Sequence, residues 1–239
     1  MYNIESRAIK KSSTGQNDPV VVGGASRFVT AFKQRNMEQK LVLFSGDLFS
    51  PSRLSTHLKG EQMVKVFNKL NVQVSCLGNH DLDFGVPKMI ELTSQTAPCD
   101  WLMSNLNVKG APVGGLKSFT IKDVPQTDGT TARIGFFGLA SPDWIPTMSP
   151  AVTEDLEYLD YIETGREMAT KLRQAPHNCT LVIAVTHMRC HDDRLLANAV
   201  PEIDLVLGGH DHSFFSEVDP DTGTFVMKSG TDFEEFSDF

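Results

Sequence analysis

The sequence predicts an α/β fold, because two kinds of segment alternate along its 239 residues. Short, almost continuously apolar runs, such as residues 179–186 and 203–207, are typical of strands buried on both faces. Longer segments with apolar residues at helical spacing lie between them. Several strand-like runs end in a residue that can bind a metal ion. Binding residues of α/β sheets gather beyond the carboxyl ends of the strands, so we expect a site at that edge.

The composition is that of a globular domain without a surface for nucleic acid or membranes. The chain has 40% apolar residues and a formal net charge of -8, spread without long blocks of one sign. The amino terminus lacks the apolar core of a signal peptide, and no run approaches the ~20 apolar residues that span a bilayer. We therefore expect a soluble, cytoplasmic protein.

The four cysteines are widely spaced and include no Cys-x-x-Cys pair: Cys76, Cys99, Cys179 and Cys190. This spacing indicates neither a thiolate zinc site nor a disulfide framework. Free thiols in a reducing compartment are the expected state.

The first elements are predicted from polar, helical and apolar patterns. Residues 8–23 are polar and predict a mobile loop that ends at two consecutive glycines. Apolar periodicity predicts helices over 25–35 and 56–70. The apolar runs 41–45 and 72–77 predict two strands. Both strands lead directly into glycine, where we expect the backbone to turn sharply.

The middle of the chain predicts one helix and three short strands. The helix is expected near residues 87–94, and the strands near 101–104, 118–121 and 132–139. A glycine-rich loop over 110–115 leads into the second of these strands. The segment is therefore expected to form a β-meander or a hairpin.

The last third repeats the alternation of helix and buried strand. After a proline-rich loop, residues 164–173 predict a helix and residues 179–186 a buried strand that ends at His187. Residues 192–199 predict another helix, and 203–207 another buried strand. No fixed repeat and no clear domain boundary are visible, so the chain is expected to form a single domain.

Four strand ends carry residues that can bind metal ions. Asp47, Asn79, His187 and His210 offer two oxygens and two imidazole nitrogens. This mixed set suits zinc, manganese, iron or cobalt. His212 adds a third imidazole. Because these loops should converge in space, the sequence predicts a metal centre.

A metal centre of this kind can hydrolyse phosphate esters. The two carboxylate oxygens of Asp47 can bridge two ions about 3.5–4 Å apart, which would hold a hydroxide as the nucleophile. His80 lies too close to Asn79 in sequence to serve the same metal easily. With Asp81 to orient it, His80 could donate a proton to the leaving oxygen.

Each candidate residue also has a structural explanation. Asp47 could cap a helix or turn, Asn79 could occupy a left-handed turn, and His187 could be a hydrogen-bonded core histidine. Their joint placement at independent strand ends favours the metal site over coincidence. Arg27 and Arg53 are candidate contacts for substrate phosphate, because a guanidinium fork suits phosphoryl oxygens. Surface solvation is the alternative for both.

Four short motifs also indicate a family when they are taken together. They are Gly46-Asp47, Gly78-Asn79-His80-Asp81, Thr186-His187 and Gly209-His210-Asp211-His212, supported by residues 43–52, 76–85 and 228–233. In this combination the chain resembles the calcineurin-like metallophosphoesterase superfamily, and within it the 5′-nucleotidase-like branch. The resemblance extends from Tyr2 to Phe233. It implies two facing mixed β-sheets flanked by helices, the metallophosphoesterase four-layer sandwich, as one domain over residues 1–239.

The resemblance also implies a role for each candidate residue. Asp47 would bridge the two metals, and Asn79, His187 and His210 would complete the site of one of them. His212 would serve the other metal. The proton donor would be His80, as leaving-group acid or transition-state donor, with Asp81 as its orienting partner.

Two departures from the family pattern shape these expectations. The family opens with a strand that ends in Asp-x-His, and residues 2–7 resemble the segment just after that Asp in a subgroup where tyrosine replaces the histidine. The missing Asp and its strand are expected before Met1. The 5′-nucleotidases of this branch also continue into a nucleobase-stacking second domain, which this chain is expected to lack.

The resemblance implies a metal-dependent hydrolase of phosphomonoesters, with 5′-nucleotides as candidate substrates and one or two divalent ions as cofactors. The alternative is a truncated, weakly active or inactive metal-binding module, because only Asp47 and His212 remain for the first metal. One ion would then be held tightly and another weakly. The expected partner is a small phosphorylated molecule, a nucleotide among the candidates, and neither a nucleic acid nor a membrane. Monoesters or diesters, and the oligomeric state, stay open.

Overall fold

The computed structural model describes residues 8–10, 20–35 and 41–238. Its elements in chain order are β1 (Ala8–Lys10), β2 (Val20–Val22), α1 (Ala25–Gln34), β3 (Leu43–Phe44), α2 (Ser55–Leu58), α3 (Glu61–Leu70), β4 (Val74–Cys76), η1 (Asn79–Leu82), α4 (Val86–Ser94), β5 (Asp100–Leu102), β6 (Leu106–Val108), β7 (Ala111–Pro112), η2 (Val113–Gly115), β8 (Phe119–Pro125), β9 (Thr131–Ala140), η3 (Pro142–Thr147), α5 (Pro150–Thr153), β10 (Leu156–Tyr158), α6 (Tyr161–Arg173), β11 (Leu181–His187), α7 (Cys190–Ala199), β12 (Leu205–Gly208), β13 (Phe214–Val218) and β14 (Phe225–Ser229). The elements labelled η are 3₁₀ helices.

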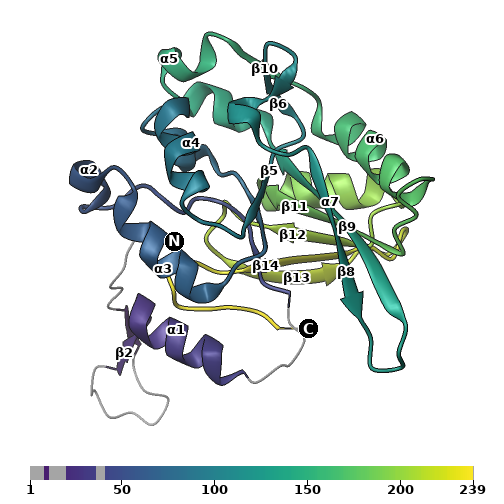
Figure 1. The fold of residues 1–239 in the computed structure, drawn as a ribbon, viewed down its shortest axis with the longest axis horizontal. Coiled ribbons are helices and arrows are strands. Elements are labelled where there is room, and N and C mark those ends of the chain that lie inside the picture. Colours follow the sequence, from purple (N-terminus) through teal and green to yellow (C-terminus); the bar gives the residue numbers. More distant parts are fainter. Residues whose placement is uncertain (1–7, 11–19, 36–40, 239) are drawn as a thin grey trace.

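Two facing β-sheets flanked by helices form the body of the molecule (Figure 1). The larger sheet has the order β13-β14-β12-β11-β9-β8 and is mixed, with parallel strands in its centre and antiparallel strands at both edges. The smaller sheet, β3-β4-β5, is parallel. The predicted α/β architecture is thereby confirmed. The antiparallel pair β8 and β9 confirms the predicted hairpin.

The larger sheet separates two hydrophobic cores. Neighbouring residues of β9 point to opposite faces, as the pleat of a strand requires. Phe136 belongs to the core shared with the smaller sheet, whereas Phe137 belongs to the core beneath α6 and α7. α6 contacts β9 and β11, and α7 contacts β12 and β14, so these helices cover the outer face. The loops that follow β3, β4, β11 and β12 come together at one edge of the two sheets.

One predicted helix is wrong, because residues 56–70 form two helices. The chain leaves α2 at Lys59 and enters α3 at Gly60, both of which have positive φ angles, 46° and 93°. A Cβ atom on Gly60 would lie 2.7 Å from Cβ of Phe49 and 2.8 Å from the side chain of Leu92. The backbone therefore approaches the core too closely for any residue but glycine, and the helix is broken there.

The predicted loop over residues 8–23 is also wrong in part. β1 and β2 pair antiparallel, whereas residues 11–19 between them lie outside the described residues. Five further strands are not among those predicted: β6, β7, β10, β13 and β14. The first three form a small separate sheet. In β14 a buried lysine, Lys228, interrupts the apolar run that would have marked it as a strand.

Asp100 ties β5 to the start of β8. Its carboxylate accepts hydrogen bonds from the ammonium groups of Lys117 and Lys122 and from the hydroxyl of Thr120. Burial by itself raises the pKa of Asp100, but these three donors outweigh burial and lower the pKa to about 2. The folded chain thus favours the charged form of this carboxyl group.

The Asp100→Asn variant is therefore expected to be less stable by about 2 kcal/mol near neutral pH. Because the folded pKa is depressed, the contribution is complete above the unfolded pKa of about 3.9 and disappears as the pH falls through about 2. Urea unfolding of both proteins at several pH values measures the difference. A difference that stays constant between neutral pH and about pH 3 would contradict this account.

None of the helices that the structure describes combines the length and the apolar composition of a membrane-spanning segment.

Candidate metal centre

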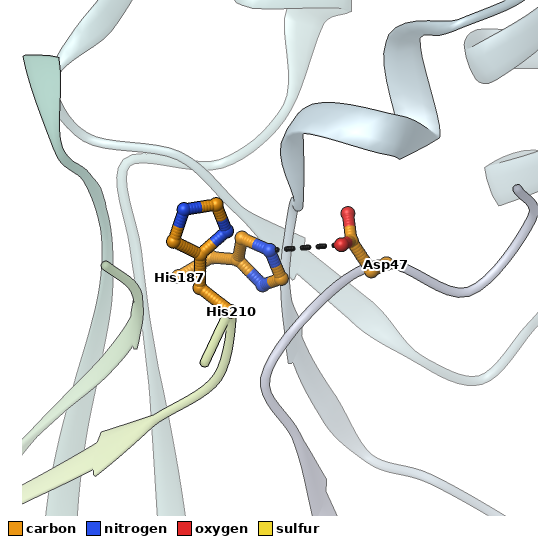
Figure 2. A group of neighbouring side chains, drawn as sticks. All are labelled: Asp47, His187 and His210. Atoms are coloured by element: carbon orange, nitrogen blue, oxygen red, sulfur yellow. Dashed lines mark ion pairs between the residues drawn. The ribbon is translucent and has the colours of Figure 1, made fainter. Parts of the chain in front are cut away.

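Four strand ends from two different sheets converge at one edge. Asp47 follows β3 and Asn79 follows β4 in the smaller sheet, whereas His187 ends β11 and His210 follows β12 in the larger one. Among the described residues, one metal-binding atom from each of Asp47, His187 and His210 lies within 4.8 Å of the others. The site is therefore built from residues of both sheets, with the Asp47 carboxylate near the two imidazole rings (Figure 2).

Asp47 lies at the centre of this cluster. Its Oδ2 is 3.1 Å from Nε2 of His187, and both side chains are buried. Burial by itself raises the pKa of Asp47, but the positive charge that a protonated His187 places beside it, supported by His80, outweighs burial and holds this pKa well below its usual range. Asp47 is thus a carboxylate at neutral pH, the form that binds a cation.

His187 is held in one orientation by its second ring nitrogen. Nδ1 lies 2.6 Å from the carbonyl oxygen of Ser45. A carbonyl only accepts, so Nδ1 carries the proton and a neutral ring has its lone pair on Nε2. This lone pair lies 3.1 Å from Oδ2 of Asp47, which is an ion-pair distance. Nε2 of His187 nevertheless has no hydrogen-bond partner among the described residues. Two electron-rich atoms this close need a proton or a metal ion between them.

His210 has a carboxylate partner that the sequence did not indicate. Its Nε2 lies 3.2 Å from Oδ2 of Asp143, which also accepts from Nε of Arg189 at 3.0 Å. A proton on Nε2 leaves the lone pair on Nδ1 for a metal. Burial first, and then the neighbouring His187, lower the pKa of His210, so the neutral form that binds metals is favoured.

Asn79 supplies the clearest test of whether the residues fit a metal ion. Its Oδ1 is buried, and it has no hydrogen-bond partner among the residues that the structure describes. A buried amide oxygen without a partner is unfavourable and rare in proteins. A divalent ion that contacts both this oxygen and Asp47 would supply the missing partner, and oxygen and nitrogen ligands in this combination suit borderline metals. The set present therefore fits such an ion.

The backbone at the centre is strained at several of the predicted ligands. Asp47, His210 and His212 have φ angles of 60°, 76° and 53°, in the left-handed region that non-glycine residues rarely adopt. Such strain collects at functional sites, where the surrounding structure enforces it. The strained positions therefore agree with a functional site at this edge.

Gly78 is required for a different reason from the one expected. Its backbone is extended, with φ -103° and ψ 163°, so the sharp turn does not depend on it. Instead, a Cβ atom on Gly78 would lie 2.3 Å from both the backbone nitrogen and Oδ1 of Asp47. The turn itself is made by η1, which starts at Asn79. Gly78 thus allows the two ligand loops to touch.

The predicted pairing of His80 with Asp81 is wrong. His80 Nδ1 lies 3.0 Å from Oδ2 of Asp83, three residues further on. This hydrogen bond raises the pKa of His80, with burial acting against it. Asp83 is therefore the residue that orients His80. The spacing of three residues, with His80 at the start of a helical turn, is the signal that would have found it.

Asp81 instead organises the backbone around Asp47. Its carboxylate is buried and accepts from the backbone N–H groups of Asp47, Leu48, Phe49 and Gly78, at 2.7 to 3.0 Å. It thereby locks the loop after β3 to the loop after β4. Its role is to position the ligands, and it acts on Asp47 rather than on His80.

A cavity of about 670 Å³ opens beside the cluster. Asp47, His187, His210 and His212 line it together with apolar residues such as Phe28, Leu43 and Ile183. His212 thus lines the same cavity as Asp47, His187 and His210, but it does not belong to the cluster that these three residues form. Its assignment to a second metal stays a prediction.

The two predicted phosphate contacts lie elsewhere. Arg27 is exposed on α1, where its Nε donates to the carbonyl of Gly23 at 2.7 Å. Arg53 is exposed just before α2. Neither is among the described residues that line the cavity. Their role in substrate binding stays a prediction.

Comparison with protein families gives one match that covers most of the chain. The model described as calcineurin-like phosphoesterase matches residues 17–214. Among individual proteins, a snake venom 5′-nucleotidase of Gloydius brevicauda is 26% identical over 90% of this chain and 37% of its own length. The 5′-nucleotidase of Homo sapiens is 29% identical over 87% of this chain and 36% of its own length. The chain thus spans little more than a third of these relatives.

Solved structures share the fold at low sequence identity. The NAD nucleotidase of Haemophilus influenzae gives a TM-score of 0.77 at 22% identity, covering 92% of this chain and 46% of that one. A calcineurin-like phosphoesterase of Bacillus subtilis gives 0.73 at 15% identity, covering 97% and 80%. These matches agree with the two facing sheets described above.

Proposed function

Because the chain belongs to the calcineurin-like phosphoesterase family, we propose that it is a metal-dependent hydrolase of phosphomonoesters, with 5′-nucleotides as its substrate class. The observation that carries the proposal is the cluster of Asp47, His187 and His210 within 4.8 Å, supported by the buried Oδ1 of Asn79, which finds no hydrogen-bond partner in the described part of the chain. When bound, divalent ions lower the pKa of water toward neutrality and neutralise phosphoryl oxygens.

The residues around the cluster supply the other parts of such a reaction. Asp47, Asn79, His187 and His210 would hold the ion. His80 is partly exposed beside them, and the Asp83 hydrogen bond favours its protonated form. A protonated imidazole can donate to the oxygen of the leaving group, which removes the charge that develops there. His80 is therefore proposed as the general acid.

The nucleotide assignment is supported by the names of the relatives. Proteins named 5′-nucleotidase occur among the snake venom and mammalian sequences that the chain matches. The chain spans about a third of the length of these relatives, so its preference for a nucleotide is proposed and is not shown by the comparison. The chain has a formal charge of -8, so an anionic substrate needs local positive charge at the site. A bound cation would provide this charge.

Removal of metal tests the proposal directly. The purified chain, treated with a chelator and then supplied with Mn²⁺ or Zn²⁺, is expected to release phosphate from adenosine 5′-monophosphate and p-nitrophenyl phosphate. Without added metal, the rate is expected to fall by about 10²-fold or more, because the charge stabilisation depends on the ion. Phosphate release by a colorimetric assay gives the rate, and adenosine 3′-monophosphate and a bis-aryl diester serve as comparison substrates.

The possible outcomes separate the candidate functions. Metal-dependent hydrolysis of the 5′-nucleotide in preference to the 3′-nucleotide and the diester supports the proposal. Metal binding without release of phosphate from any substrate would favour an inactive metal-binding module of the same fold. Hydrolysis that persists in the chelator would contradict a metal-dependent reaction.

A further inference from the structure

A buried lysine contacts the two loops that carry His187 and His210 of the candidate metal centre. Lys228 is 2% exposed and lies in β14, beside Gly208 in the parallel register with β12. A lysine ammonium is strongly disfavoured in a protein interior unless carbonyl oxygens or carboxylates surround it. The partners of Lys228 therefore indicate what it does.

The Lys228 ammonium joins the backbones of the two histidine loops. Nζ donates to the carbonyl of Met188 and to the carbonyl of Gly209, each at 2.6 Å. Met188 directly follows His187, and Gly209 directly precedes His210. The two loops leave different strands, β11 and β12. The ammonium group of Lys228 thus links the backbone next to His187 with the backbone next to His210.

Two carboxylates hold the ammonium in this position. Asp193, which is fully buried in α7, has its Oδ2 2.9 Å from Nζ, and Oδ2 of Asp211 lies 3.2 Å from it. Oδ1 of Asp193 accepts from the hydroxyl of Thr186 at 2.6 Å. Asp211 accepts from the backbone N–H of Cys190. Residues on both sides of His187 and His210 are thereby connected to Lys228 or its partners.

Gly208 makes room for this network. A Cβ atom there would lie 2.4 Å from Oδ2 of Asp193 and 3.0 Å from Cε of Lys228. Any larger residue at position 208 would displace either the carboxylate or the lysine. The glycine at the end of β12 is therefore explained by the lysine beside it.

We propose that Lys228 is a positioning residue that sets the separation of the two histidine ligands. A buried ion pair can often be replaced by apolar residues of similar volume without loss of stability, so a contribution to stability does not by itself explain a lysine at position 228. An apolar side chain could not donate to two carbonyl groups at once. The inference rests on the proposed metal centre, because it concerns the affinity of that centre for its ion.

Two double variants separate positioning from folding. Lys228→Met alone would leave the Asp193 carboxylate buried and unpaired, so each variant also carries Asp193→Asn, whose amide oxygen can still accept from Thr186. The first variant is K228M/D193N and the second is K228Q/D193N. Methionine and glutamine have similar length and no charge, but only glutamine can donate hydrogen bonds. D100N/K122M, which removes a partly buried ion pair between β5 and β8, is the matched control.

Calorimetric titration with Mn²⁺ and thermal melting of the metal-free proteins give the result. The Met variant is expected to bind Mn²⁺ about 10- to 100-fold more weakly than the wild type, the range typical for lost partners of metal ligands. The Gln variant is expected to stay within about threefold, and the control to bind like the wild type. The Met and Gln variants are expected to melt cooperatively at similar temperatures.

Equal Mn²⁺ affinity in the Met and Gln variants would overturn the inference, whether both are unchanged or both are weakened. Loss of cooperative melting in the Met variant would also overturn it, because Lys228 would then serve folding. A wild-type chain that binds no Mn²⁺ would instead overturn the proposed function itself, and this inference with it.

Discussion

The Asp47→Asn variant is expected to lose its bound metal and at least about 10³-fold of its hydrolytic rate, equivalent to about 4 kcal/mol of transition-state stabilisation. Asp47 is the one carboxylate in the cluster that it forms with His187 and His210. Replacing it by an amide removes the negative charge that the ion faces, while His187 and His210 stay in place. A metal that is held only by neutral ligands is bound much more weakly.

The fold of this variant is expected to survive. Asparagine adopts positive φ angles more readily than other non-glycine residues, so it suits the φ of 60° at position 47. Its amide oxygen can still accept from the backbone N–H of His80, which lies 2.9 Å from Oδ1 of Asp47. Metal analysis, thermal melting and phosphate release are the measurements. Asp100→Asn is the control, which should lose stability and keep the activity; an Asp47→Asn protein with wild-type metal content would exclude Asp47 as a ligand.

The His80→Ala variant is expected to lower kcat by about 10²- to 10⁴-fold while the metal content and the melting temperature stay unchanged. The imidazole of His80 is 37% exposed, so its loss should not disturb the core. It is not part of the cluster of Asp47, His187 and His210, so its loss should not release the ion. The reason for the lower kcat is the missing proton donor. Steady-state kinetics with adenosine 5′-monophosphate, together with metal analysis, measures both effects.

The leaving group distinguishes the acid role from a general loss of activity. A nitrophenolate leaves without protonation, whereas a nucleoside oxygen needs a proton. His80→Ala should therefore impair hydrolysis of the nucleotide much more than that of p-nitrophenyl phosphate. Asp83→Asn, which removes the orienting carboxylate, should show the same pattern with a smaller loss. Equal losses on both substrates, or a parallel loss of metal, would show that His80 is not a leaving-group acid.

β3, β11 and β12 could be predicted because each carries a nearly continuous apolar run, and the predicted helices because each has an apolar face. The runs over 179–186 and 203–207 agree with β11 and β12 to within two residues. The break at Gly60 was not predictable, because it depends on the approach of Phe49 from a distant part of the chain. β14 was missed because Lys228, a charged residue, occupies a buried position.

For the site, the sequence indicated the candidate ligands but not the residues that orient them. The convergence of Asp47, Asn79, His187 and His210 could be predicted because each lies at or just after the end of a strand. The partners depend on side-chain geometry instead. Asp81 contacts the backbone of the Asp47 loop, 32 to 34 residues earlier in the chain, and not its neighbour His80. Asp143 reaches His210 across 67 residues, which no local pattern reveals.

Binding of Mn²⁺ to the chelator-treated chain tests the central claim most directly. Calorimetric titration is expected to show saturable, tight binding of about one ion per chain, through the ligands Asp47, Asn79, His187 and His210. The Asp47→Asn and His187→Ala variants are expected to lose this binding, whereas Asp100→Asn should keep it. Absence of saturable binding in the wild type, or binding of equal strength in the Asp47→Asn variant, would contradict a metal centre at this edge of the two sheets.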